Sequence, residues 1–447
     1  MSSVFSYGDF LLFSDLAYWD RPQHLSIEVT NRCNLRCTHC FQSYFSFPRG
    51  DLLPEVWKKI QPELPYLRSV SLSSAGEPLL TPNFQQYLET CLDFGISVGF
   101  TTNAHLLENW LERLVGRLRF LSVSLDAISE EGYRLRRRAS LRPVVSALRR
   151  LKVLKEASGT KYPELSLIVV LNRENVSELP DLVRFGGEIE ARYLYVYHQI
   201  FYSEEEFRHK SLWFDKKSYD LFLKEALRQA SRRQVKLIHP GSFGGEIPPH
   251  PATSAYLTAT PNGFFCQWIF NTSTVSWNGF VQACCFCDRL FMGTLLKDDL
   301  FSVWNGPAYR FLRLQFLKRQ VPTECRNCQF LQVVSLNRNV FLCPHREENF
   351  YHERALLLPK SSLSYRLAEK YYQRGLSLLH KGNFEGASKE FSILVEKEPL
   401  YFEGLNALAV SLALQGKKYR ARELLAEALN IFPREKTISQ NWRILKD

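Results

Sequence analysis

Three cysteines, Cys33, Cys37 and Cys40, lie close together near the start of the chain. They follow an alternating run of apolar and polar residues over 25–30, which predicts a β-strand that delivers a cysteine-bearing loop. Thiolates are the ligands of iron–sulfur clusters, and a cubane [4Fe–4S] cluster usually takes four of them. Because only three are local here, either a distant cysteine completes the set or one iron stays open for a substrate or cofactor.

Zinc and disulfide bonds are the two alternatives for these thiols. Structural zinc sites mostly combine a CxxC pair with a second pair of ligands, and disulfides need an oxidising compartment. Residues 1–20 contain three Asp and no Lys or Arg, unlike a signal peptide. No apolar run approaches the ~18 residues of a membrane span. We therefore expect a cytoplasmic protein with no membrane partner, in which eleven cysteines suit metal clusters.

The pattern CxxxCxxC after a first strand resembles the signature of radical S-adenosylmethionine (SAM) enzymes. The resemblance implies that Cys33, Cys37 and Cys40 hold a [4Fe–4S] cluster, and that the amino and carboxylate groups of SAM chelate its fourth iron. His39 stands where the family usually has a large or aromatic residue. Phe41 matches the aromatic residue that often lies near the adenine of SAM.

Strand-like and helical stretches alternate after the cysteine loop. Alternating strands and helices predict a parallel sheet with catalytic residues at the C-terminal ends of its strands. Six such units agree with the α/β fold of the radical SAM family, a partial (β/α)6 TIM-like barrel, which we assign to residues 24–235 after an extension over 1–23. The predicted strands are 67–72, 96–100, 120–125, 165–170 and 193–197, and the predicted helices are 84–94, 106–115, 144–157 and 176–185.

Short motifs after the second and third strands resemble SAM-binding motifs of the family. Ala75, Gly76 and Glu77 resemble the GGEP motif, whose backbone faces the methionine amino group of SAM. Asn103 closes the third strand in a sequence that resembles Thr-Asn-Gly. Residues 172–175, after the fifth strand, resemble a family asparagine motif and equally fit a helix N-cap.

Ser124 and Asp126 close the fourth strand and resemble the family's Ser-Ile-Asp-Gly. Arg136 suits the family arginine that pairs with the SAM carboxylate, since a guanidinium group can bind a carboxylate through two hydrogen bonds. Arg137 and Arg138 are alternatives for this role. The resemblance names no catalytic side chain.

The formal net charge is +11, and arginines crowd residues 134–150. This cluster fits a solvated helix face, or a site for an anion such as the SAM carboxylate, a substrate carboxylate or an acidic leader peptide. No RNA- or DNA-binding motif accompanies the charge, so nucleic acid is not an expected partner.

A second set of cysteines lies in the latter half of the chain. Residues 274–283 predict a β-hairpin with its turn at 278–279, which would present the cysteine that follows it. Four cysteines with one CxxC pair would also satisfy zinc. The set comprises Cys266, Cys284, Cys325 and Cys328.

This region resembles the auxiliary-cluster extensions called SPASM and twitch. It departs from the full SPASM pattern because only Cys343 remains after the CxxC pair. The resemblance implies one auxiliary [4Fe–4S] cluster in a small α+β iron–sulfur domain over 258–345, with Cys285 as the alternative to Cys284. Cys285, Cys287 or Cys343 could also donate a hydrogen atom, as in the family's epimerases, whereas Cys91 is expected in the core.

The C-terminal region contains an internal repeat. A shift of 34 residues superposes small residues and prolines, which resembles tetratricopeptide (TPR) repeats. We therefore assign residues 362–447 to an all-α TPR-like tail that binds a peptide or a partner protein. The repeated positions are Gly382, Ala387 and Pro399, which recur as Gly416, Ala421 and Pro433.

Together the resemblances imply a radical SAM oxidoreductase or maturase. It would make a 5′-deoxyadenosyl radical that abstracts a substrate hydrogen, and the auxiliary cluster would take up an electron. An electron donor such as flavodoxin or ferredoxin is implied. The repeats and the basic surface favour a ribosomally made peptide or protein as substrate. The single auxiliary cluster fits a dehydrogenase or epimerase of a small molecule, such as a sugar or aminoglycoside.

Iron content tests the assignment of the two cysteine sets. Anaerobically reconstituted protein is expected to carry about eight irons, as two [4Fe–4S] clusters. Replacing Cys33, Cys37 and Cys40 together by Ala should leave about four. Stoichiometric zinc, measured in the same samples, would contradict the cluster assignment of the second set.

Overall fold

The structure is a computed structural model. Two compact units divide it, one formed mainly by residues 21–304 and the other by residues 305–315 with the helices after residue 362. The described residues are 21–73, 75–250, 257–260, 263–284, 291–318, 320, 325, 363–398, 401–432 and 435–446.

A ten-stranded sheet forms the core of the first unit, in the order β12-β11-β10-β1-β2-β3-β4-β5-β6-β7. Strands β1 to β7 are parallel and follow one another in chain order, as the sequence predicts for the first six. Their bounds are β1 His24–Ile27, β2 Ser69–Ser71, β3 Ser97–Thr102, β4 Phe120–Ser124, β5 Glu164–Leu171, β6 Tyr193–His198 and β7 Lys236–Ile238.

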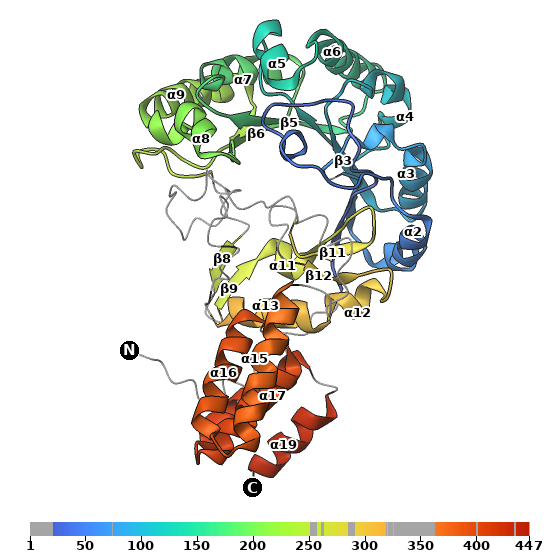
Figure 1. Ribbon diagram of the computed structural model, residues 1–447. Coiled ribbons are helices and arrows are strands. Elements are labelled where there is room, and N and C mark those ends of the chain that lie inside the picture. Colours follow the sequence, from blue (N-terminus) through green and yellow to red (C-terminus); the bar gives the residue numbers. More distant parts are fainter. Residues whose placement is uncertain are drawn as a thin grey trace. The chain divides into compact units, whose positions relative to one another are not determined.

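Helices lie along the outer face of this curved sheet (Figure 1). Phe84 of α3 packs against Phe100 of β3, and Gly186 of α7 lies against Leu167 of β5. Cys91 is buried in α3, as predicted for a core residue, and burial raises its pKa to about 12. The helices are α2 Pro54–Ile60, α3 Phe84–Asp93, α4 Leu111–Leu114, α5 Glu130–Arg137, α6 Arg142–Ala157, α7 Leu179–Glu188, α8 Glu204–Lys210 and α9 Lys216–Arg233.

Several predicted boundaries are wrong, each for a local reason. The first strand ends at Ile27, because the chain then turns so that Thr30 can form an isolated antiparallel bridge with Asp51. The helix predicted over 106–115 is a 3-10 turn, Leu107–Trp110, followed by the single turn α4. The helix predicted from residue 176 begins as a 3-10 turn, and α7 starts at Leu179, with Pro180 in its first turn.

A solvated helix face is one interpretation of the arginine cluster, but the sequence gives no bounds for helix α5, because its Arg-rich sequence has few apolar residues to show a helical period. Ser129 caps it by accepting a hydrogen bond from the Gly132 N–H, and Glu130 and Glu131 occupy its first turn. The sequence also named no element over 200–257, where α8, α9 and β7 complete the parallel part of the sheet.

The predicted hairpin is confirmed, as β10 Thr272–Val275 and β11 Phe280–Gln282. Gly279 in its turn has a φ of 85°, which favours glycine. Strand β10 pairs in parallel with β1, so this hairpin and β12 Phe291–Thr294 continue the barrel sheet. Strands β8 Leu257–Thr260 and β9 Gly263–Cys266 pair separately, and α11 Gln267–Asn271 and α12 Leu300–Trp304 follow.

The second unit is helical. Residues that the 34-residue shift superposes are buried in both copies, namely Ala387 with Ala421 and Phe391 with Leu425. Gly375 of α15 lies against the Phe391 ring, where a Cβ atom would come within 2.4 Å of the ring. Its helices are α13 Pro307–Leu317, which crosses the unit boundary, α15 Leu363–His380, α16 Phe384–Lys397, α17 Phe402–Leu414, α18 Lys418–Ile431 and α19 Lys436–Lys446.

Within the described part of the chain, no helix is both long enough and apolar enough to cross a membrane.

Gly76 allows the loop after β2 to approach the chain that enters the cysteine loop. A Cβ atom at Gly76 would lie 2.5 Å from the carbonyl oxygens of both Thr30 and Arg32. These are backbone atoms, so the loop itself would have to move.

We expect Gly76→Ala to destabilise the protein by about 1–3 kcal/mol and to weaken SAM binding, measured by thermal unfolding and anaerobic SAM titration.

Gly186→Ala is the matched control, because a Cβ atom there meets its nearest neighbour at an ordinary 3.5 Å. Wild-type SAM affinity in Gly76→Ala would contradict a role for this close approach in the site.

Candidate functional site

The cysteine loop connects β1 to a 3-10 turn over Phe41–Ser43. Burial raises the pKa of the Cys33 and Cys40 thiols, the latter to about 11, and the charges of neighbouring loop cysteines raise them further. Cys37 is therefore close enough to both of these thiols for its charge to disfavour their ionisation. Iron supplies the positive charge that such a set needs to bind as thiolates, so the loop fits a cluster.

Within the described residues, no group of three or more His, Cys, Asp or Glu is arranged around a single metal ion. A cubane cluster has a different geometry, because each of its irons takes its own thiolate.

Arg137 supplies a buried positive charge to this loop. Its Nη1 lies 3.6 Å from Cys37 Sγ, and its Nη2 lies 2.7 Å from a carboxylate oxygen of Asp126. Burial alone would raise the pKa of Asp126, but the positive charges around it, chiefly that of Arg137, hold it below its usual range. Burial lowers the pKa of His39 to about 3 against the opposing charge of Asp126, so the imidazole is neutral at pH 7.

Asn103 approaches Cys33 from the end of β3. Its side-chain Nδ2 lies 3.8 Å from Cys33 Sγ and donates to Asn34 Oδ1 at 2.8 Å. The Leu35 N–H also donates to Cys33 Sγ, at 3.5 Å. N–H groups aimed at sulfur stabilise the thiolate and, once a cluster is bound, tune its potential.

Glu77 links the ends of β2 and β3 beneath the loop. Its N–H donates to the Arg32 carbonyl at 2.8 Å, and its carboxylate accepts from Thr102 Oγ1 at 2.8 Å and the Asn103 N–H at 2.7 Å. Burial raises its pKa to about 7 despite these hydrogen bonds. Glu77 thus holds the two predicted SAM-binding segments together.

Gln42 is a site residue that no sequence motif identified. It is buried, and its side-chain Nε2 donates to the carbonyls of Asn31 at 2.9 Å and Ala75 at 2.7 Å. Its Oε1 accepts from Arg49 at 2.9 Å. Gln42 therefore fixes the loop carrying Ala75 against the cysteine loop. A glutamine just past the third cysteine gives no signal of this contact in sequence.

Arg136 is a buried cation with spare donors. Its Nη2 donates to the Val170 carbonyl at 2.9 Å, and its Nη1 lies 3.8 Å from a Glu174 carboxylate oxygen. Within the described residues its Nε makes no hydrogen bond. Its own carbonyl accepts from the Thr38 N–H at 2.8 Å, which places it beside the cysteine loop. These donors fit a carboxylate ligand such as that of SAM.

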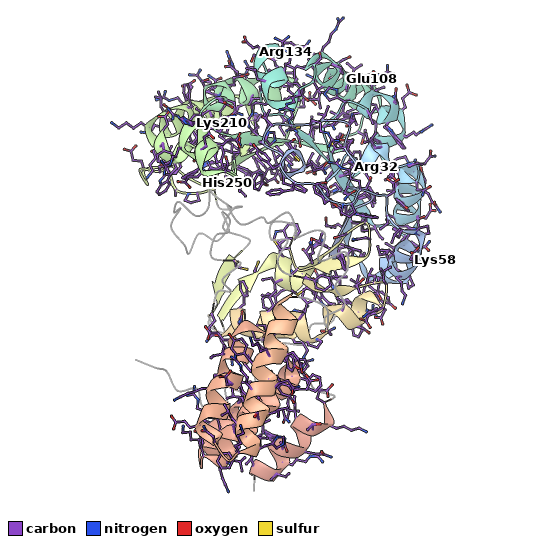
Figure 2. The ribbon with its side chains drawn as sticks, viewed as in Figure 1. Arg32, Lys58, Glu108, Arg134, Lys210 and His250 are labelled. Carbon is purple, nitrogen blue, oxygen red and sulfur yellow. The ribbon has the colours of Figure 1, made fainter. Side chains whose placement is uncertain are left out.

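The other arginines of the cluster differ in exposure. Arg137 is buried with Arg136, whereas Arg134 (labelled in Figure 2) and Arg138 are exposed. Both interpretations of the arginine cluster therefore apply. One face of α5 is exposed to solvent, and the other faces the site, where it could bind an anion.

The remaining predicted SAM contacts have the following surroundings. Phe41 stacks on Phe47, with ring centroids 5.4 Å apart. Ser124 is partly exposed at the end of β4. Asp126 is fully buried and pairs with Arg137, and its contact with SAM stays a prediction. Asn175 donates to the carbonyls of Asp126 and Val170, at 2.7 and 3.0 Å, so it joins β4 to β5.

Three cysteines of the second set are described. Burial raises the pKa of Cys266 to about 11, and the nearby Cys284 raises it further, so these two thiols are neighbours. The backbone N–H groups of Trp268 and Ile269, at the start of α11, point toward Cys266 and oppose this rise. Cys325 is buried. The predicted ligand Cys328 lies outside the described residues, as do Cys285, Cys287 and Cys343.

Comparison with known families and curated proteins agrees with these two sites. Residues 27–186 match the radical SAM superfamily model, and residues 266–329 match the SPASM iron–sulfur cluster-binding domain.

The chain is 27% identical over 169 residues to the tungsten-containing aldehyde ferredoxin oxidoreductase cofactor-modifying protein of Pyrococcus furiosus, covering 36% of this chain and 48% of that protein. It is 26% identical over 193 residues to the PqqA peptide cyclase of Bradyrhizobium diazoefficiens, covering 40% and 47%. The chain thus spans about half the length of each of these two relatives.

A longer match joins the chain to the mycofactocin maturase MftC of Mycobacterium ulcerans, 25% identical over 309 residues, covering 66% of this chain and 78% of that protein. Among solved structures, Streptococcus suis SuiB bound to S-adenosylmethionine has a TM-score of 0.54 at 16% identity, covering 75% and 79%. Native anSMEcpe with bound AdoMet has a TM-score of 0.52 at 17% identity, covering 75% and 95%. At these identities the structures show a shared fold.

The chain therefore contains a radical SAM domain over residues 27–186 and a SPASM iron–sulfur domain over residues 266–329, and its cofactors are SAM and iron–sulfur clusters.

Proposed function

We propose that this protein is a radical SAM maturase that oxidises or cross-links a ribosomally made peptide or protein in the cytoplasm. The observation that carries the proposal is the continuous sheet in which β10, the first strand of the hairpin before Cys284, pairs with β1, the strand before Cys33. The cysteine loop and the hairpin that leads to Cys284 therefore follow neighbouring strands of one scaffold, which suits one substrate bound between two redox centres.

Two clusters are proposed, one that binds SAM and is held by three thiols, and one auxiliary [4Fe–4S] cluster held by four. When bound, the first cluster and SAM supply a 5′-deoxyadenosyl radical that abstracts a hydrogen atom from a substrate C–H bond. The proposed ligands are Cys33, Cys37 and Cys40 for the first cluster, and Cys266, Cys284, Cys325 and Cys328 for the second.

The chain's own residues position the cofactor and exclude competing contacts. Arg136, with an unused buried Nε, pairs with the SAM carboxylate. The backbone around Ala75 and Gly76 approaches the methionine amino group, held there by Gln42 and Glu77. Phe41 lies along the adenine, and Asn103 and Ser124 face the ribose and methionine from the ends of β3 and β4.

The peptide substrate is supported by relatives named for peptide chemistry. One is the PqqA peptide cyclase, and another is SuiB, whose fold was also determined with its precursor peptide SuiA. The mycofactocin maturase, which matches over a longer stretch, is named as a maturase. We propose that the C-terminal helices, as TPR-like repeats, recruit the peptide or a partner. A flavodoxin or ferredoxin would supply the electron.

Anaerobic incubation with SAM, dithionite and candidate precursor peptides, followed by mass spectrometry, tests the proposed function. A peptide that loses an even number of hydrogens, or gains a cross-link, would support it. Turnover of a sugar or aminoglycoside under the same conditions, with peptides left unchanged, would favour the dehydrogenase or epimerase alternative.

Single cysteine variants separate the two proposed clusters. Cys33→Ala should abolish SAM cleavage, because the SAM-binding cluster loses a thiolate. Cys325→Ala should retain uncoupled cleavage of SAM to 5′-deoxyadenosine while peptide modification fails, measured by chromatography and mass spectrometry on the same samples. If Cys325→Ala forms both products at wild-type rates, the auxiliary cluster has no redox role.

Truncation after Ser362 tests recruitment by the C-terminal helices. SAM cleavage without substrate should be largely unchanged, whereas kcat/KM for a peptide substrate should fall. Because Leu314 packs in the same apolar cluster as these helices, the truncated protein must be shown to be monodisperse and to retain its iron. Unchanged kcat/KM in such a protein would contradict recruitment.

A further inference from the structure

Glu28 is a buried carboxylate at the C-terminal end of β1, and no motif accounts for it. Its Oε1 accepts a hydrogen bond from the Ala75 N–H at 3.3 Å, and its Oε2 accepts one from the Trp277 N–H at 3.2 Å. Because β1 lies between β2 and β10, the two N–H groups come from the chains that leave its neighbours on either side. One carboxylate thus joins the ends of three adjacent parallel strands.

The two segments that Glu28 joins belong to different cofactor sites. Ala75 lies in the loop proposed to face the methionine part of SAM. Trp277 lies in the turn of the β10–β11 hairpin, and the second strand of that hairpin leads directly to Cys284, a proposed ligand of the auxiliary cluster. A shift of either segment would break its hydrogen bond to the same carboxylate.

The hairpin turn has two further attachments to the chain around the cysteine loop. The Trp277 carbonyl accepts from the Leu53 N–H at 3.0 Å. The Trp277 ring lies so close to Gly50 that a Cβ atom there would be 2.3 Å from the ring. Gly50 is in turn held by Asn31, whose Oδ1 accepts from the Gly50 N–H at 2.8 Å. The turn is therefore fixed through its N–H, its carbonyl and its ring.

We infer that Glu28 is a positioning residue that sets the separation between the SAM site and the auxiliary cluster. A carboxylate can accept from both sides at once, and charge-assisted hydrogen bonds to backbone N–H groups are stronger than neutral ones. The inference rests on the proposed sites of both clusters. It goes beyond them by assigning to one side chain the direct link between the two sites.

Glu28→Gln is the direct test, because glutamine has the same size but only one acceptor oxygen, so one of the two N–H groups loses its partner. With both clusters loaded and reduced, we expect pulsed electron paramagnetic resonance (EPR) to give a broader distribution of cluster–cluster distances than in the wild type. We also expect the Kd for SAM, measured by anaerobic titration, to rise about tenfold.

Glu178→Gln is the matched control. Glu178 also accepts two backbone N–H hydrogen bonds, from Ile128 at 2.8 Å and Ser129 at 2.9 Å, but it contacts neither the loop carrying Ala75 nor the hairpin. Both N–H groups donate to the same oxygen, Oε2, so glutamine can keep both bonds and the variant removes only the carboxylate charge. It should leave both the distance distribution and SAM affinity unchanged. An effect that comes only from losing a carboxylate charge would appear equally in both variants.

A wild-type distance distribution in iron-loaded Glu28→Gln would overturn the inference, as would equal broadening in Glu178→Gln. If Glu28→Gln does not load its clusters, Glu28→Asp replaces it, because aspartate keeps the carboxylate but is one methylene shorter, so it cannot reach both N–H groups. That variant should broaden the distances, and a wild-type distribution would again overturn the inference. Neither the distance distribution nor the Kd for SAM needs a substrate. The inference can therefore fail while the proposed peptide chemistry stands, and the peptide chemistry can fail while the inference stands.

Discussion

The buried ion pair between Arg137 and Asp126 is the interaction on which the cysteine loop depends. A guanidinium group buried without a partner would be costly. Burial alone would lower the pKa of Arg137, but Asp126 and Cys37 raise it, so this cation stays charged beside a thiol that must become a thiolate. Asp126 also accepts from the Val170 N–H at 2.8 Å, which fixes the pair to β5. One buried charge thus links two strands, helix α5 and the cluster loop.

The ends of successive strands each contribute one group to the segments around this site. Glu28 comes from β1, Glu77 from the loop after β2, Asn103 from the end of β3 and Arg137 from the helix after β4. Parallel strands bring these groups to one edge of the sheet. The same arrangement explains why the second cysteine set can be held close by: β10 extends the sheet on the other side of β1 and follows the same parallel direction.

Local patterns predicted most of what lies along the chain. The strand–helix alternation, the hairpin before Cys284 and the core position of Cys91 follow from side-chain periodicity and turn residues, and the structure confirms them. The bounds of helix α5 could not be predicted, because charged residues occupy the positions where apolar periodicity would mark a helix. The pairing of β10 with β1 escaped prediction because contacts between distant segments leave no local trace. The roles of Glu28 and Gln42 could not be predicted for a related reason. Each side chain acts by hydrogen-bonding backbone groups that are distant in the sequence.

EPR spectroscopy of the reduced protein tests the central claim, that the three-cysteine loop holds a cluster with an iron open to SAM. Cys266→Ala removes a ligand of the second set, so the spectrum of this variant should report the first cluster alone. The account predicts a reduced [4Fe–4S] signal whose g values change when SAM is added. A reduced signal that saturating SAM leaves unchanged would contradict it.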